Sequence, residues 1–481
     1  MIDTKALKQK ILDLAMRGKL VPQDPNDEPV EELLARIREE RKKLEKEKKI
    51  SKVEESDIYW SDDDNCYYEK VGQIIKTIDN KKMPISHNIK NRSFQKLSFL
   101  STSSMGQTIL SSDLDIEGIP VYSATMDDSP FGYIKETKNK MYLTKGDIVI
   151  PARGNSIGYV TYINDSLATC TQTTIALYPI TKVISKFVYY YFKAYKDYLF
   201  EYVGGAIPQI TLKMINEIIV PLPPLQEQER IVNKIDKLFE LVDKIEKDQQ
   251  ELEELKKQAK DKVLELAVTG KLVKQDPNDE PASVLLERIK AEKEKLIKEG
   301  KIKREKADLE PISDDDKNYY KNINSSWCVC RLSNVIRLTS GYDLTPNEYH
   351  SIRCDDDIPY MTGASNFTSN NLIVNRYTQI KYCNSHIDDI LITCKGTIGK
   401  IAINTIGDLH IARQIMGITS YINTQFNVLL ILNTVYKLQI KAKSMIPGIE
   451  RNDLLNEVVA IPNLDEQERI CRKFKLLNSL L

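Results

Sequence analysis

The chain contains two segments twice. GKLVPQDPNDEP at 18–29 recurs as GKLVKQDPNDEP at 270–281, an offset of 252 residues with 11 of 12 positions identical. PPLQEQERI at 223–231 recurs as PNLDEQERI at 462–470, an offset of 239 residues. The stretches between the copies barely resemble each other. A long internal repeat has to be interpreted before any local motif, and this one predicts two unlike modules mounted on a duplicated frame.

The frame is predicted to be helical. From Ile231 to Leu266 apolar residues recur in alternating steps of four and three, which is typical of a coiled-coil seam. Pro223-Pro224 marks the start of this helix and Gly270 its end. A second charged helix is expected from Ala282 to about Lys306, where it could fold back on the first.

The two chain ends carry complementary parts of the frame. By the offset of 252, Met1 corresponds to Glu253, and by the offset of 239, Leu481 corresponds to Val242. The N-terminus therefore supplies the second part of a rod and the C-terminus the first part. We expect the ends to dock and rebuild a pseudo-twofold copy of the central coil, lacking the ten positions equivalent to 243–252.

Each module mixes short β-rich runs with a few helices, such as the one expected at 185–200. KGDIVIPARGNSIG at 145–158 parallels DDILITCKGTIG at 388–399, and AIPQI at 206–210 parallels MIPGI at 445–449. The modules therefore look like two diverged copies of one fold. We expect an α+β multidomain chain with a cyclic pseudo-twofold arrangement, divided into an N-terminal helical segment at 1–60, a first module at 61–225, a central coiled coil at 226–316, a second module at 317–463 and a C-terminal helix at 464–481.

The composition is that of a soluble cytoplasmic protein without a membrane span or secretion signal. The net charge is formally zero, but 67–225 holds 17 Lys and Arg against 13 Asp and Glu, and 317–463 holds 14 against 11. Any DNA binding must therefore come from local patches. The eight cysteines and four histidines show no metal-ligand spacing, and no histidine is paired with an acid and a nucleophile. We expect neither a metal nor a cofactor.

The motifs of catalysis are missing as well. The Pro-Pro pair at 223–224 lacks the Asn or Asp before it and the aromatic residue after it that adenine methyltransferases carry. Gly399-Lys400 lacks the remaining residues of a phosphate-binding loop. The Glu-Gln-Glu-Arg stretches at 227–230 and 466–469 are explained by helix-start chemistry rather than by catalysis.

Several sequence features together resemble the specificity subunit of a type I restriction–modification enzyme. They are LKQKILDLAMRGKLVPQDPNDEP, its second copy, the Pro-x-Leu-x-Glu-Gln-Glu-Arg-Ile boundaries and the GDI(V/L)I…G…IG strands. The resemblance covers essentially the whole chain. It implies two target-recognition domains, each reading one half of a bipartite double-stranded DNA site, spaced by antiparallel conserved helices. It also implies partners, namely two methyltransferase subunits and restriction–translocase subunits. Two alternatives remain open: a coiled-coil scaffold with two protein-binding modules, and a stand-alone nuclease or methyltransferase.

DNA binding requires Lys and Arg on phosphates, and Arg, Asn or Gln on base edges. In the first module the candidates are a basic segment and four further positions, two of them in the loop after a strand. They are Lys76, Lys81, Lys82, Lys90, Arg92 and Lys96, followed by Arg153, Asn155, Gln172 and Gln209. In the second module the corresponding candidates are Lys395, Thr397, Arg413, Gln414, Lys441, Lys443 and Arg451. Arg413-Gln414 is aligned with Thr171-Gln172.

Overall fold

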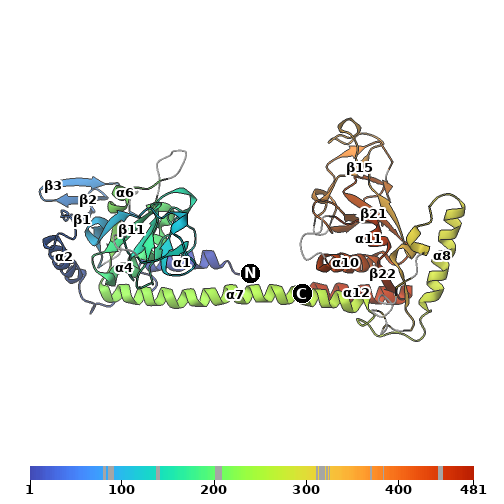
Figure 1. Cartoon of the computed structure of the whole chain (residues 1–481), viewed down its shortest axis with the longest axis horizontal. Coiled ribbons are helices and arrows are strands. Elements are labelled where there is room, and N and C mark those ends of the chain that lie inside the picture. The colour runs from blue at the N-terminus through green and yellow to red at the C-terminus, as the bar shows by residue number, and fades with distance from the viewer. Residues whose placement is uncertain are drawn as a thin grey trace. The chain divides into compact units, whose positions relative to one another are not determined.

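The computed structural model describes residues 1–79, 83–84, 91–136, 141–200, 209–309, 312–313, 320, 323, 325–368, 371–382, 384–441 and 448–481. The chain divides into two compact units, Met1–Gln250 and Glu251–Leu481. A single continuous helix, α7 (Leu225–Val268), begins in the first unit and ends in the second (Figure 1). Among the described residues, no helix combines the length and the apolar character needed to span a membrane.

The first unit consists of two frame helices followed by a mixed α/β module. Its regular elements, besides short 3-10 turns, are α1 (Thr4–Met16), α2 (Val30–Lys46), β1 (Asp57–Ser61), β2 (Cys66–Val71), β3 (Ile74–Ile78), β4 (Ser93–Lys96), α3 (Leu97–Leu100), β5 (Ser101–Met105), β6 (Ile119–Tyr122), β7 (Gly132–Ile134), β8 (Ile148–Pro151), β9 (Thr161–Tyr162), β10 (Thr169–Cys170), β11 (Thr174–Pro179), α4 (Ser185–Ala194), α5 (Lys196–Leu199), α6 (Leu212–Asn216), β12 (Ile219–Leu222) and the start of α7.

The second unit begins with the end of α7 and repeats the plan. Its regular elements are α8 (Ala282–Lys298), β13 (Cys328–Arg331), β14 (Ile336–Ser340), β15 (Ile358–Met361), β16 (Tyr377–Thr378), β17 (Asn384–Ser385), β18 (Ile390–Thr393), β19 (Ile401–Ile403), β20 (Leu409–Ile411), β21 (Ile415–Ser420), α10 (Thr424–Lys441), α11 (Arg451–Leu455), β22 (Val458–Ile461) and α12 (Leu464–Leu480).

The two modules share one strand topology. The antiparallel sheet β5-β11-β8-β9 corresponds to β14-β21-β18-β19, and the parallel pair β6·β10 corresponds to β15·β20. An early strand of each module, β4 or β13, pairs antiparallel with its last strand, β12 or β22. The prediction that the modules are diverged copies of one fold is therefore confirmed. In the first unit, the hairpin strands β1–β3 extend the β4 sheet.

The central frame helix ends where the sequence predicts, at Gly270, and α1 ends in the same way at Gly18, because a glycine reverses the backbone. Gly18 and Gly270 both have positive φ, of 66° and 72°. The next amide donates back to the helix in both cases, from Lys19 to the carbonyl of Leu14 and from Lys271 to that of Leu266. This is the hydrogen-bonding pattern of a glycine C-cap. The helix predicted to run to about Lys306 stops earlier, at Lys298, because Gly300 makes the same reversal at φ 70°.

In each unit, a short frame helix packs against part of α7. In the first unit, α1 shares a hydrophobic core with the start of α7, where Ile231, Ile235 and Val242 are buried. In the second unit, α12 shares a core with the end of α7. Burial of the seam is confined to the two ends of α7, since Leu252 and Leu255 between them are exposed.

Equivalent salt bridges join the two repeated motifs of the frame. Arg230 pairs with Asp27 at 2.6 Å in the first unit, and Arg469 pairs with Asp279 at 2.5 Å in the second. The two arginines are 239 residues apart and the two aspartates 252, so each bridge links the same two positions of the repeat. The DPNDEP motif is therefore held at the start of the helix that follows each module.

A buried glutamate lies beside each of these bridges. Glu227 and Glu466 are both 1% exposed. In the first unit, Arg92 forms an ion pair with Glu227 at 3.4 Å, and in the second Trp327 donates its indole N–H to Glu466 at 3.0 Å. Arg92 and Trp327 occupy the same position, directly before β4 and β13. The Glu-Gln-Glu-Arg stretches are therefore structural, as predicted, although their main contacts are tertiary.

Replacing Arg92 by Ala leaves Glu227 buried without its ion-pair partner. Removing one member of a buried pair costs about 3–5 kcal/mol because the remaining charge is uncompensated. We expect faster hydrogen exchange in α1 and at the start of α7, measured on the full chain. The double variant Arg92→Met, Glu227→Leu removes both charges and should recover most of the loss. Equal losses in the single and double variants would contradict this account.

The glutamates also predict a pH dependence. Burial raises the pKa of Glu227 and of Glu466 above the ordinary value of 4.5. The folded state therefore binds the proton more tightly than the unfolded state, and stability falls as pH rises from about 4.5 through the folded-state pKa. Glu466→Gln should lose this part of the slope in urea unfolding followed across that range. Glu468→Gln, at an exposed position of the same helix, should keep it.

Candidate nucleic-acid interface

Three segments of the first unit meet at the end of β8. The Ala152 amide donates to the carbonyl of Thr173 at 2.9 Å, and the Ile210 amide donates to the carbonyl of Ala152 at 3.0 Å. A β-bridge joins Arg153 to Gln209. The predicted candidates of these segments are all exposed. We call them the first loop cluster: Arg153, Asn155, Gln172 and Gln209.

The same junction exists in the second unit at the end of β18. The Cys394 amide donates to the carbonyl of Gln414 at 2.8 Å, and the Ile449 amide donates to the carbonyl of Cys394 at 2.9 Å. These bonds place Ile449, the last residue of MIPGI, at the position of Ile210, the last residue of AIPQI, while residues 206–208 and 445–447 of the two segments lie outside the described residues. The candidates here are also exposed. We call them the second loop cluster: Lys395, Thr397, Arg413 and Gln414.

Two glycines with positive φ shape the loop of each cluster. Gly154 and Gly396 have φ of 78° and 74°, and Gly158 and Gly399 have φ of 84° and 80°. L side chains rarely adopt this region. At Gly399 a Cβ would also lie 2.9 Å from a methyl carbon of Val435. Positive-φ glycines thus recur in both loops, with three residues between them in the first and two in the second, while the exposed side chains differ.

The hydrogen bonds correct one detail of the alignment. Ala152 bonds to Thr173 as Cys394 bonds to Gln414, so Gln414 occupies the position of Thr173 rather than that of Gln172. Arg413 therefore corresponds to Gln172. The sequence alignment was shifted by one residue because the turns between the strands offer few identical residues.

The candidates in the basic segment of the first module differ in their exposure and in their contacts. Lys76 is exposed on β3. Arg92 is completely buried against Glu227 and also donates to the carbonyl of Met16 at 2.7 Å, so it cannot contact DNA from this position. The ammonium group of Lys96 lies 2.7 Å from Glu69 and 2.8 Å from Glu217. The predicted candidates Lys81, Lys82 and Lys90 lie outside the described residues.

Candidates flanking the MIPGI segment are only partly described. Arg451 forms an ion pair with Glu305 and donates to the carbonyl of Leu338 at 2.8 Å, so its guanidinium is engaged within the unit. Lys441 is the last residue of α10, and its side chain lies outside what the structure describes, as does all of Lys443. The loop clusters are therefore the candidate groups whose side chains are exposed together.

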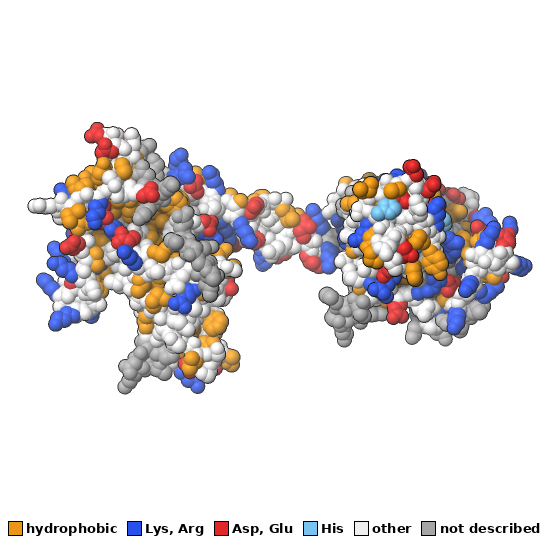
Figure 2. Space-filling view, turned by 90° about the horizontal axis from the view of Figure 1, so that it is seen from above, with side chains coloured by type: hydrophobic (Ala, Val, Ile, Leu, Met, Phe, Trp, Pro, Cys, Tyr) orange, Lys and Arg blue, Asp and Glu red, His pale blue; other side chains and the backbone are white. Residues whose placement is uncertain are grey.

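Charge is mixed on the surface of each unit. Figure 2 shows basic and acidic side chains interspersed with polar and hydrophobic ones on the visible face. This agrees with the zero net charge of the chain. Local groups such as the loop clusters, rather than a field of one sign, must then carry any attraction for phosphates.

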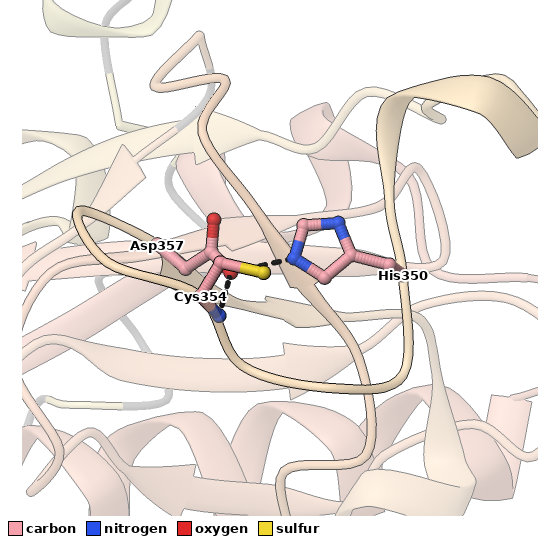
Figure 3. A group of neighbouring side chains, drawn as sticks. All are labelled: His350, Cys354 and Asp357. Carbon is pink, nitrogen blue, oxygen red and sulfur yellow. Dashed lines mark hydrogen bonds and ion pairs between the residues drawn. The ribbon is translucent and has the colours of Figure 1, made fainter.

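The second unit holds a side-chain group that the sequence analysis missed. His350 Nε2 lies 2.5 Å from a carboxylate oxygen of Asp357, and the thiol of Cys354 lies beside them (Figure 3). The expectation that no histidine is paired with an acid beside a nucleophile is therefore wrong. The same carboxylate oxygen accepts the Cys354 amide at 2.6 Å, which closes the turn before β15. The group offers three potential ligands among the described residues, whereas a structural zinc site uses four.

Comparison with known proteins identifies the family. The sequence model described as "Type I restriction modification DNA specificity domain" matches residues 93–257 and 324–480. These two segments include both loop clusters, so the duplicated junctions described above belong to two copies of one domain.

Two curated relatives come from Escherichia coli. The type I restriction enzyme EcoAI specificity subunit is 31% identical over 405 residues, covering 72% of this chain and 65% of the relative. The EcoEI specificity subunit is 31% identical over 389 residues, covering 69% and 62%. The chain thus spans slightly less than two thirds of either relative.

A solved structure, described as "Structural basis underlying complex assembly and conformational transition of the type I R-M system", has a similar fold. It gives a TM-score of 0.55 at 14% identity, over 82% of this chain and 91% of that chain. The duplicated domain, its position on the repeated frame and these similarities agree. The chain belongs to the type I restriction–modification DNA specificity family.

Proposed function

We propose that this chain is a non-catalytic DNA-recognition subunit that reads a bipartite double-stranded site, one half-site per module. The observation that carries the proposal is the repeated strand-end junction. One backbone arrangement appears twice with different exposed side chains, as expected of two readers built on one scaffold. Arg and Gln side chains in these positions suit base edges, and Lys suits phosphates. The same proposal takes the modules as 61–225 and 317–463.

The partners follow from the family. We propose that the frame at 1–60, 226–316 and 464–481 docks two adenine methyltransferase subunits, and that restriction–translocase subunits join them in the cytoplasm. The exposed apolar residues of the α7 middle, Leu252 and Leu255, offer surface for helix packing by a partner or by the chain ends. The second rod predicted from the two termini belongs to this proposal.

The alternative function is a scaffold with two protein-binding modules, and sequence-specific DNA recognition by this chain would exclude it. The decisive experiment maps methylated adenines in a host carrying the methyltransferase partner, with and without this chain. We expect methylation at one bipartite sequence only when the chain is present. Chain-independent methylation, or methylation without sequence preference, would contradict the proposal.

The loop clusters predict separable effects on binding. Arg153→Ala should weaken binding of DNA carrying the first half-site, and Lys395→Ala should weaken binding through the second module. A lost phosphate contact reduces the slope of log affinity against log salt by about one, whereas a lost base contact relaxes one position of a half-site by about 1–3 kcal/mol. Titrations at several salt concentrations measure both. Lys46→Ala, an exposed charge at the end of α2, is the control.

We propose that α7 acts as a ruler: its length sets the distance between the modules and therefore the number of base pairs between the half-sites. Seven residues inserted after Glu254 lie in the exposed part of the helix and lengthen it by about 10 Å, the rise of roughly three base pairs. The methylated sequence should keep both halves and gain a longer gap. An unchanged gap with both halves intact would contradict the ruler.

A further inference from the structure

One exposed arginine of the second loop cluster is held by a single carboxylate at two points. Arg413 lies in the turn between β20 and β21. Its backbone amide donates to Asp343 Oδ1 at 3.0 Å, and its Nε lies 2.6 Å from Asp343 Oδ2. The Arg413 side chain is nonetheless 70% exposed. Among the described residues, no hydrogen bond or ion pair to another side chain engages its guanidinium, which leaves donors available for a ligand.

Fold stability does not explain this pair. An exposed ion pair contributes about 0–1 kcal/mol, because solvent screens it and two flexible side chains lose freedom. Its effect is instead on geometry, since the carboxylate restricts the rotamers of a long side chain before any ligand arrives. A preoriented guanidinium loses less freedom on binding, and its two terminal amino groups match the O6 and N7 acceptors of guanine.

The first unit shows that the shared scaffold does not require the pair. The Tyr342 amide bonds to Ile411 as the Gln107 amide bonds to Cys170, so the residues that follow in each unit, Asp343 and Thr108, are equivalent. Arg413 itself corresponds to Gln172. The arginine and its carboxylate thus occur together in one unit, and both are replaced in the other. Such joint variation at exposed positions is expected where two readers differ in the base they select.

The surroundings of Arg413 resemble a nucleic-acid contact surface. Tyr342 and Tyr382 are 56% and 73% exposed, and their rings pack edge to face with centroids 5.5 Å apart. Lys395 is exposed on the neighbouring loop, which is bonded to Gln414. On double-stranded DNA, exposed cations suit phosphates, and an exposed aromatic ring offers apolar contact to a base edge in the groove.

We propose that Arg413, oriented by Asp343, reads a guanine in the half-site of the second module. Asp343 is then a positioning residue, acting through the arginine. The inference rests on the proposed DNA-recognition function, and it adds the identity of one base and the pair of residues that selects it.

The test uses the full chain with its methyltransferase partner and maps the methylated sequence. Arg413→Lys keeps the charge and removes the guanidinium fork, so one G·C position of one half-site should become degenerate. Asp343→Asn keeps an acceptor for the Arg413 amide and removes the charge. It should reduce discrimination at the same position, measured with duplexes altered only there, by about tenfold or more. That factor lies toward the lower end of the range for a good bidentate contact.

Arg353→Lys is the matched control, because Arg353 is an exposed arginine on a different loop of the same unit. It should leave the sequence unchanged. Thermal unfolding of each variant should match the wild type, which excludes loss of the fold as the cause. An unchanged sequence in Arg413→Lys, relaxation at an A·T position, or full discrimination in Asp343→Asn would each overturn the inference. Failure of the wild-type chain to direct methylation would instead overturn the proposed function.

Discussion

The start of the helix after each module is the point on which each unit depends. A glutamate is buried there, beside a salt bridge that ties the helix to the DPNDEP motif of the frame. Burying a carboxylate is costly unless donors surround it. The residue before β4 or β13 supplies such a donor, and these strands pair with β12 or β22, so the paired strands and the frame helix are held at one site.

The two modules share one backbone scaffold and differ in the exposed side chains that it carries. The strand order, a pair of positive-φ glycines in the loop after β8 or β18, and the backbone bonds at its junction recur in both. The exposed residues carried by those loops do not. A scaffold that does not depend on these side chains for stability leaves them free to change, as the proposed function of two different readers requires.

Much of the architecture could be predicted from the sequence because it is periodic or repeated. The helix start after Pro224, the glycine cap at Gly270 and the equivalence of the modules follow from local rules, and the structure confirms them. The contacts of Arg92 could not be predicted, because a cluster of lysines and arginines gives no sign of which one is buried. The Asp343–Arg413 pair was also missed, since it joins residues 70 positions apart across two turns.

The two buried glutamates have unlike partners, and this bears on how such chains change over time. Glu227 and Glu466 belong to the repeated frame, whereas Arg92 and Trp327 are brought by the modules. A module that kept Arg92 in front of β4, or Trp327 in front of β13, would carry its own group to cover the glutamate of the recipient frame. Under the proposed function, recombination before that residue would exchange recognition and keep the buried glutamate partnered, whereas a crossover just after it would separate the glutamate from the group adapted to it.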